Sequence, residues 1–194
     1  MNENDSRIEP EIIPEIVGRR ARRALSEESI DRVTLDRIFT AATLAASCSN
    51  KQPWRFLVCT GDGSIDVARE ALTTGNYWAT KAPVLVVVMT AYELDCQLND
   101  ERNYAWFDTG MAVAHLLLQA TREGLYAHPM AGFKPDVLRE RFGIGNETRI
   151  ITMIAIGHPG DSSHLNENHL ESEKSERMRK PIDEIVSWES WSGL

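Results

Sequence analysis

Two groups of arginines near opposite ends of the chain carry the side chains best suited to bind an anion. They comprise Arg19, Arg20, Arg22, Arg23, Arg177 and Arg179. A guanidinium presents a planar fork of N–H donors that matches the oxygens of a phosphate group. The sequence therefore predicts one phosphate site made from two distant segments. The alternative is solvated surface charge, in which these arginines only pair with the acidic excess of the chain.

A polar segment, residues 47–52, is rich in hydroxyl and amide side chains. Amides offer both donors and acceptors, which suits the edge of a heteroaromatic ring. Cys48 lies within this segment and is either a redox thiol or a small residue that fills space. The three cysteines have no CxxC spacing, so we expect reduced thiols and no zinc framework.

The histidines predict neither a metal site nor an acid–base pair. No carboxylate is placed by sequence to orient His115 or His128, so we expect a helix-packing residue and a loop residue. His164 and His169 have a spacing that fits no usual metal motif. We therefore predict no bound metal.

Composition and charge limit the class of protein. The chain has 194 residues and 42% hydrophobic content, enough for one domain with a real core. A formal charge of −8 disfavours a nucleic-acid surface or an anionic membrane as partner. Residues 1–11 are polar and predicted to be flexible, and no apolar run is long enough to span a bilayer. The expected location is the cytoplasm.

Periodicity predicts five helices and three strands. The helices are expected at residues 12–17, 34–45 with Thr34 as the cap, 64–72, 108–123 and 136–142, and the strands at 55–60, 83–89 and 149–156. Residues 161–175 are read as an exposed connection because they are nearly all polar. The pattern indicates an α+β layer, and with no GxGxxG or GxxxxGK[ST] motif, nucleotide phosphates would be held by side chains.

Five segments carry a family resemblance from about residue 12 to residue 188. They are RRARR, ASCSNKQPWRF, GNYWATKAPVLVV, DTGMAVAHLLLQATREGLYAHPMAGF and RMRKPIDEIV. In this order and spacing they resemble the FMN-dependent nitroreductase family. The resemblance implies an α+β nitroreductase-like domain over residues 1–194, with a central mixed or antiparallel β-sheet flanked by helices. It also implies an interlocked homodimer with FMN at the interface, in which residues 176–194 pack on the partner subunit.

The resemblance also implies which residues bind the cofactor and the substrate. The cofactor-binding set is Arg19, Arg20, Arg23, Ser47, Asn50, Gln52, Asn76, Pro129, Met130, Ala131, Gly132, Arg177 and Arg179. Trp78 and Tyr104 are the candidates for contact with a planar substrate, although such aromatic residues are more often part of the core. Asn76 could instead form only a turn after Gly75, and residues 129–133 could be a plain loop between helices.

Three departures from the family pattern bear on the flavin site. Ala21 stands where many relatives have a serine that binds the phosphate, which removes one hydrogen bond of about 1 kcal/mol. Ala131 stands where some members carry an acidic residue. The stretch of residues 61–74 is also shorter than usual.

The activity implied by the resemblance is oxidoreduction with bound FMN. Hydride would come from NADH or NADPH and then pass to an electron-poor acceptor such as a nitroaromatic or a quinone, in ping-pong order. No catalytic side chain is expected, because the cofactor supplies the redox chemistry. The alternatives are a non-catalytic flavin- or phosphate-binding regulatory module, and a specialised flavin oxidase or dehalogenase of the same family.

Overall fold

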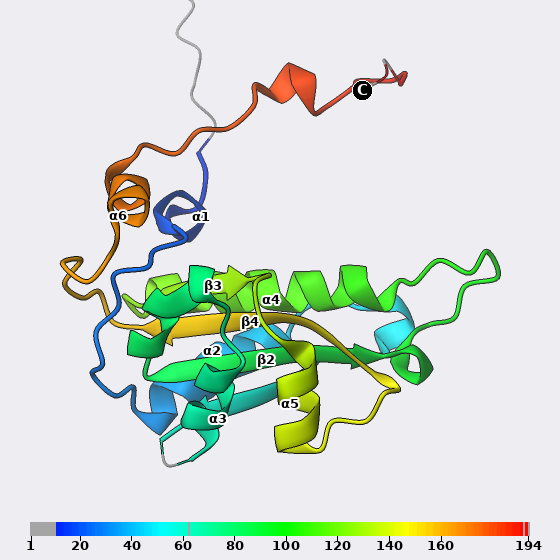
Figure 1. The fold of residues 1–194 in the computed structure, drawn as a ribbon. Coiled ribbons are helices and arrows are strands. Elements are labelled where there is room, and N and C mark those ends of the chain that lie inside the picture. The colour runs from blue at the N-terminus through cyan, green and yellow to red at the C-terminus, as the bar shows by residue number, and fades with distance from the viewer. Residues whose placement is uncertain (1–10, 62, 192, 194) are drawn as a thin grey trace, which may run out of the picture.

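A computed structural model describes residues 11–61, 63–191 and 193 (Figure 1). Residues 1–10 of the predicted flexible start lie outside the described residues. The strands are β1 (Arg55–Thr60), β2 (Val84–Ala91), β3 (Tyr126–Met130) and β4 (Thr148–Gly157). They form one sheet in the order β1-β2-β4-β3 with every pair antiparallel, so the α+β class is confirmed.

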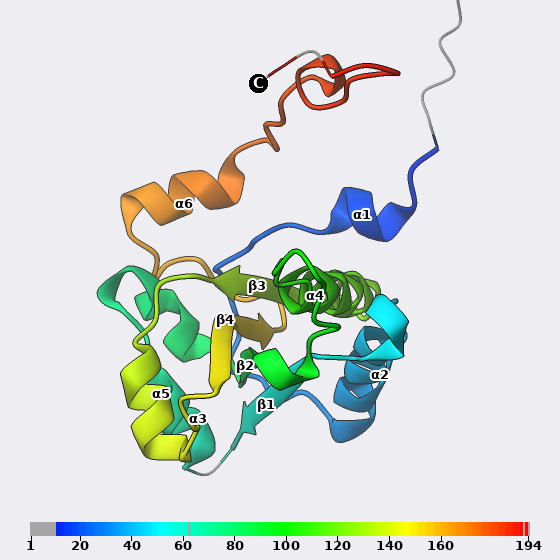
Figure 2. The same cartoon turned by 90° about the vertical axis from the view of Figure 1, so that its right-hand side faces the viewer.

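Helices cover both faces of this sheet (Figures 1 and 2). The helices of the described residues are α1 (Pro14–Gly18), α2 (Arg32–Thr43), α3 (Ser64–Glu70), α4 (Ala105–Arg122), α5 (Pro135–Phe142) and α6 (Glu167–Lys174), and those on the two faces are α2 with α4 and α3 with α5. Successive side chains of a strand point to opposite faces. Val86 of β2 and Ile154 of β4 therefore pack with α2 and α4, whereas Leu85 and Met153 pack with α3 and α5. This two-sided burial explains the continuous apolar runs of the two central strands.

Strand β3 was missing from the sequence prediction, which placed a loop there. It pairs with β4 at the edge of the sheet, with Pro129 opposite Ile154. Proline cannot donate to a strand ladder, but it is tolerated on an edge strand because one side of that strand has no partner. The predicted count of three strands was therefore wrong by one, and residues 126–130 of the candidate site lie on a strand.

One helix cap differs from the prediction, and one helix was not predicted. Asp31 caps α2 instead of Thr34: its carboxylate accepts the Thr34 N–H at 2.9 Å and the Thr34 hydroxyl at 2.7 Å. The stretch 161–175 is exposed as expected, yet it contains α6, because Asn166 caps this helix by accepting the His169 N–H at 2.9 Å. Cap bonds of this kind start a helix even where apolar periodicity is weak.

The C-terminal segment that follows α6 runs away from the body of the chain (Figures 1 and 2). It leaves large apolar side chains in solvent, with Ile182 exposed by 70%, Trp188 by 79% and Trp191 by 72%. In the parts of the chain that the structure describes, no helix is both long enough and apolar enough to cross a membrane.

Candidate functional site

The fold joins the two arginine groups into one positively charged cluster. Burial lowers the pKa of Arg19, and the like charges of Arg177 and Arg179 lower it further. Arg20 adds a smaller repulsion of the same sign. Arginine keeps its charge in proteins, so the guanidinium of Arg19 is repelled by those of the other three arginines. An anion placed among them would relieve that repulsion. We call Arg19, Arg20, Arg177 and Arg179 the arginine cluster.

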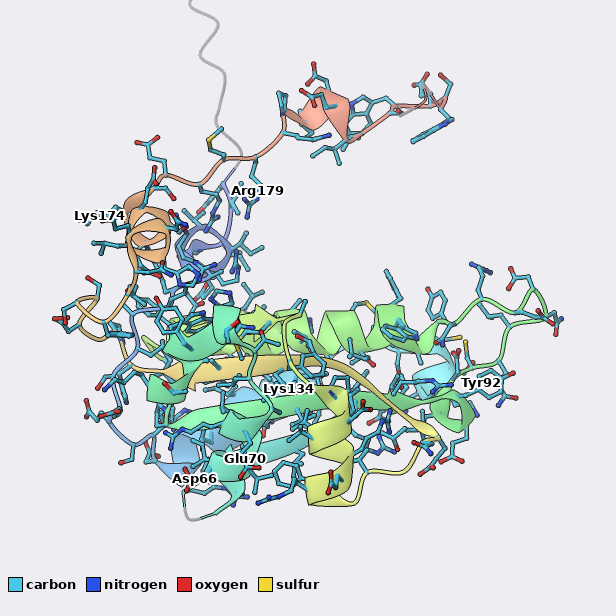
Figure 3. All side chains as sticks on the ribbon, in the orientation of Figure 1. Asp66, Glu70, Tyr92, Lys134, Lys174 and Arg179 are labelled. Atoms are coloured by element: carbon cyan, nitrogen blue, oxygen red, sulfur yellow. The ribbon has the colours of Figure 1, made fainter. Side chains whose placement is uncertain are left out.

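Backbone carbonyls at the end of α1 hold the second arginine segment in place. Arg177 donates to the carbonyl of Ile16 at 3.1 Å, to that of Val17 at 2.9 Å and to that of Arg19. Arg20 donates to the Ser175 carbonyl at 2.6 Å. These bonds join residues more than 150 positions apart in the sequence. Figure 3 shows Arg179 on the chain that leaves α6 and passes over α1.

Arg23 points elsewhere, into the body of the chain. Its guanidinium lies 5.9 Å from the centre of the Trp78 ring, a cation–π arrangement, and its buried Nε has no hydrogen-bond partner among the described residues. Its backbone N–H donates to Glu173 of α6 at 2.5 Å. Glu173 also pairs with Arg22 at 3.6 Å. The structure thus separates Arg22 and Arg23 from the arginine cluster.

His128 of β3 is a buried neutral imidazole next to these groups. Its ring lies 4.6 Å from the Trp78 ring, and its Nδ1 lies 3.0 Å from the carbonyl oxygen of Arg22. Because a carbonyl only accepts, Nδ1 carries the proton. Burial lowers the pKa of His128 from 6.5 to about 4. The sequence expectation of a loop residue was wrong, since the imidazole lies in a strand and is 8% exposed.

This histidine predicts a loss of stability in weak acid. Between pH 6.5 and about 4 the unfolded chain binds a proton that the folded imidazole refuses, so stability is complete above pH 6.5 and declines as pH falls through this window. A shift of this size corresponds to about 3 kcal/mol of unfolding free energy. Urea titrations at several pH values should show the decline in the native protein and a smaller decline in His128→Gln. Equal pH dependence in both proteins would contradict the assignment.

A second part of the predicted cofactor set meets around Gly132. The carbonyl of Gly132 accepts from the Asn76 amide at 2.7 Å and from the Thr73 hydroxyl at 2.8 Å. A Cβ at this glycine would lie 2.8 Å from Thr73 Oγ1 and 2.9 Å from Asn76 Nδ2, so these two side chains would have to move to make room for it. Glycine therefore lets Asn76 and the end of β3 approach each other. Pro129 is half-buried, Met130 is buried and Ala131 is exposed in the same run.

The third part is the polar segment, which forms the single turn η1 (Cys48–Asn50) and the residues around it. Ser47 Oγ accepts the Gln52 N–H at 3.0 Å, and the Gln52 amide donates to Asn50 Oδ1 at 3.1 Å. Asn50 and Gln52 have φ values of 55° and 48°, in the left-handed region. Such backbone, held by side-chain bonds, presents amides to the outside in a fixed pattern.

Asp108 holds this segment in place, and the sequence analysis missed it because it lies in the first turn of an apolar helix. It is fully buried, and Oδ2 accepts the Cys48 N–H at 3.1 Å, while Oδ1 has no partner among the described residues. Burial raises the pKa of Asp108, the bond from Cys48 opposes this, and the charge of Asp95 adds to the rise. The sequence did contain a sign of this role, because an acidic residue among apolar helix positions indicates a buried carboxylate.

One chain does not bring the first and the third of these parts together. The arginine cluster lies at α1 and α6, whereas η1 lies at the opposite end of the sheet, beyond the start of α4 (Figure 1). Tyr104 precedes α4 at that same far end and is half-buried. Trp78, the other aromatic candidate, is only 1% exposed and packs in the core, so the structure does not support substrate contact by this ring.

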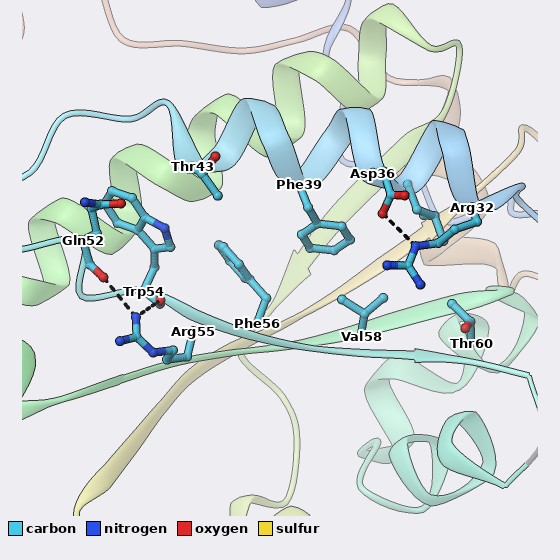
Figure 4. Close-up of a pocket in the computed structure, with 11 residues that line it drawn as sticks. Arg32, Asp36, Phe39, Thr43, Gln52, Trp54, Arg55, Phe56, Val58 and Thr60 are labelled. Atoms are coloured by element: carbon cyan, nitrogen blue, oxygen red, sulfur yellow. Dashed lines mark hydrogen bonds and ion pairs between the residues drawn. The ribbon is translucent and has the colours of Figure 1, made fainter.

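A cavity of about 510 Å³ lies between α2 and β1 (Figure 4). Its apolar wall includes Phe39 and Phe56, whose ring centres are 5.6 Å apart, and Val58. Gln52 is the one residue that it shares with the predicted cofactor set. This cavity is therefore not the candidate flavin site. Among the residues that the structure describes, no group of three His, Cys, Asp or Glu side chains could hold a metal ion.

Comparison with known proteins supplies independent information on the chain. The profile of the Nitroreductase family matches residues 16–74 and 66–158. An uncharacterized 15.4 kDa protein from the ask 5′ region of Mycolicibacterium smegmatis is 34% identical over 141 residues, covering 68% of this chain and 91% of that protein. A NADH dehydrogenase of Thermus thermophilus is 24% identical, covering 88% and 92%. A crystal structure of an oxidoreductase containing FMN superposes with a TM-score of 0.85 at 29% identity, covering all of both chains.

Proposed function

The chain belongs to the nitroreductase family, and from this premise we propose that it is an FMN-dependent oxidoreductase. The proposed reaction takes hydride from NADH or NADPH and delivers it to an electron-poor acceptor such as a nitroaromatic or a quinone. The similarity to a NADH dehydrogenase and to an FMN-containing oxidoreductase supports this proposal.

The observation that carries the proposal is the arginine cluster. Arg19 and Arg20 come from the start of the chain and Arg177 and Arg179 from its end, yet they lie close enough for their charges to repel. A phosphate dianion suits this cluster because it offers several acceptor oxygens and offsets the repulsion. We assign the phosphate of FMN to this cluster, and leave Arg23 with a supporting role through Trp78.

The remaining residues fit the ring of the cofactor. Asn76 lies against Gly132, and a side chain at residue 132 would collide with it. Ser47, Asn50 and Gln52 supply amide and hydroxyl groups suited to the polar edge of an isoalloxazine. Bound FMN would supply the hydride chemistry, while these residues orient it and tune its environment through hydrogen bonds. Tyr104, half-buried beside this region, is proposed to contact a planar acceptor.

A homodimer would complete the site. The arginine cluster and the segment around η1 lie at opposite ends of one chain, so two chains are needed for both to reach one FMN (Figure 1). Closed twofold symmetry would then produce two equivalent sites. We propose that the body of the chain forms one nitroreductase-like domain and that residues 176–194 pack on the partner subunit.

The cavity between α2 and β1 is the proposed seat of the partner's C-terminal segment. Phe39, Phe56 and Val58 present an apolar wall, and strand β1 forms an edge of the sheet (Figure 4). Exposed edges and apolar walls of this kind are usually covered in native proteins. The exposed Ile185 and Trp188 of the C-terminal segment have the matching chemistry.

An absorption spectrum of the purified protein tests the proposed function. We expect flavin bands near about 370 and 450 nm, and release of FMN on heating. Without oxygen, NADH or NADPH should bleach the longer band, and a quinone should restore it. A flavin that neither nucleotide reduces would indicate the non-catalytic binding module instead. A colourless protein that fails to take up FMN would contradict the proposal.

A further inference from the structure

Hydrogen bonds join the end of α6, and the chain after it, to the segment that carries the first arginine group. At the first level, Glu173 of α6 accepts the Arg23 N–H at 2.5 Å. The second level is the bond from Arg20 to the Ser175 carbonyl, and the third is the bonding of Arg177 to the end of α1. The partners follow in reverse order along the two segments, so the segments run antiparallel.

Glu173 is the acidic side chain at the first of these levels, and it is only 10% exposed. One carboxylate oxygen accepts the Arg23 N–H, and the other lies 3.6 Å from the Arg22 guanidinium. Arg22 also donates to the backbone carbonyl of Glu173. Hydrogen bonds to an ionised acceptor are shorter and stronger than those between neutral groups. Glu173 therefore fixes where the end of α6 lies against this segment.

The start of α6 is anchored as well. The Tyr77 hydroxyl accepts the Asn166 N–H at 2.7 Å, and the Tyr77 ring stacks on the His169 ring with 5.5 Å between centres. Because both ends of the helix are held, the chain that leaves α6 starts in a defined direction. Figure 3 shows this chain running from Lys174, the residue after Glu173, to Arg179.

The charge of Glu173 is unfavourable for an anion site. A carboxylate next to an arginine cluster lowers the positive potential that a phosphate would experience there. Charge alone therefore predicts that neutralising Glu173 would strengthen phosphate binding. A contribution of Glu173 to binding must come from the bonds that it accepts, and the two effects have opposite signs.

We propose that Glu173 is a positioning residue, which sets the register between α6 and residues 16–23 and thereby assembles the arginine cluster. This inference rests on the proposed function, in which that cluster binds the phosphate of FMN. Without the carboxylate, the Arg23 N–H loses its acceptor and the end of α6 is released. The two arginine segments then spend less time in the arrangement that binds phosphate, so binding weakens although the site becomes more positive.

Fluorescence titration of full-length apoproteins with FMN separates position from charge. Glu173→Ala removes both the charge and the acceptor, and should weaken FMN binding at least about tenfold. Glu173→Gln removes only the charge, because its amide oxygen still accepts the Arg23 N–H. It should bind FMN within about threefold of the native protein or more tightly. Glu173→Asp keeps the charge but is one methylene shorter, and should weaken binding by at least about threefold.

Glu171→Ala is the matched control, because it removes the same charge from an exposed position of the same helix. It should bind FMN at least as tightly as the native protein. Riboflavin has no phosphate, so the native protein and all four variants should bind it equally. Near-ultraviolet circular dichroism checks that each variant folds, and Glu173→Asp tests the inference if Glu173→Ala does not.

Amide hydrogen exchange of the apoprotein tests the register without any flavin. Exchange at the Arg23 amide should be faster in Glu173→Ala than in the native protein, and close to native in Glu173→Gln. A native protein that binds no flavin would contradict the proposed function, whereas this exchange pattern would still support the register set by Glu173.

Four results would overturn the positioning role. They are FMN binding by Glu173→Ala as tight as that of the native protein, an equal loss of FMN and riboflavin, a loss in Glu173→Gln as large as in Glu173→Ala, and unchanged exchange at the Arg23 amide. The first would leave only the effect of charge, and the second would indicate general damage to the fold.

Discussion

Replacing Arg19 and Arg179 together with alanine is expected to weaken FMN binding by at least about 100-fold, because each loses a charge-assisted bond worth about 1.5–3 kcal/mol. The two residues come from opposite ends of the chain and meet in the arginine cluster. Fluorescence titration of the apoprotein with FMN measures the effect. Riboflavin, which has no phosphate, should bind the variant and the native protein equally.

Two controls separate lost binding from lost folding. Arg141→Ala removes an arginine of α5 that pairs with Glu70 of α3 at 3.3 Å. Both residues lie far from the arginine cluster, so FMN affinity should not change (Figure 1). The apoprotein of the double variant should unfold at no lower urea concentration than the native apoprotein. The reason is that removing Arg19 and Arg179 relieves repulsion between like charges. Unchanged FMN affinity in the double variant would show that these arginines serve only as surface charge.

Deleting residues 182–194 is expected to convert a dimer into a monomer and to abolish tight FMN binding. The deleted segment carries Ile182, Ile185, Trp188 and Trp191, all more than 60% exposed in the single chain. Burying a side chain of this size contributes about 1.5–3 kcal/mol. Their joint loss should raise the dissociation constant of the dimer by more than about 1000-fold. Sedimentation velocity over a range of concentrations measures this change.

A matched variant changes the same segment without its apolar residues. Asp183→Asn with Glu184→Gln alters only exposed polar groups and should leave the dimer intact. The truncated chain retains the sheet and both core clusters, so its circular dichroism should remain that of a folded α+β protein. A truncated protein that remains a dimer would place the interface elsewhere and remove the reason for a shared flavin site.

Local features of the fold were predictable because short-range chemistry decides them. The β-branched run around Val86 can only be a buried strand, and Gly143, with φ of 66°, ends α5 as a left-handed residue. The arginine groups and the amide-rich segment 47–52 were also visible, because their side-chain types match phosphate and ring edges. The family resemblance implied the order of these segments, and the family profile covers the first arginine group and the segment 47–52.

Other features depended on which elements pack together. The sequence analysis missed edge strand β3 because Pro129 has a low strand propensity. The strand forms because it pairs with β4. Trp78 was a substrate candidate by type, but its burial against His128 makes it a core residue.

What the sequence by itself determined is the set of chemical groups and most of the elements that carry them. Only the tertiary structure decided which groups meet: Arg177 with the end of α1, Asn76 with Gly132, and Asp108 with the backbone of η1. It also decided that the arginine cluster and η1 lie at opposite ends of one chain (Figure 1). Periodicity and propensity act over a few residues, whereas these contacts depend on the path of the whole chain and on its packed core.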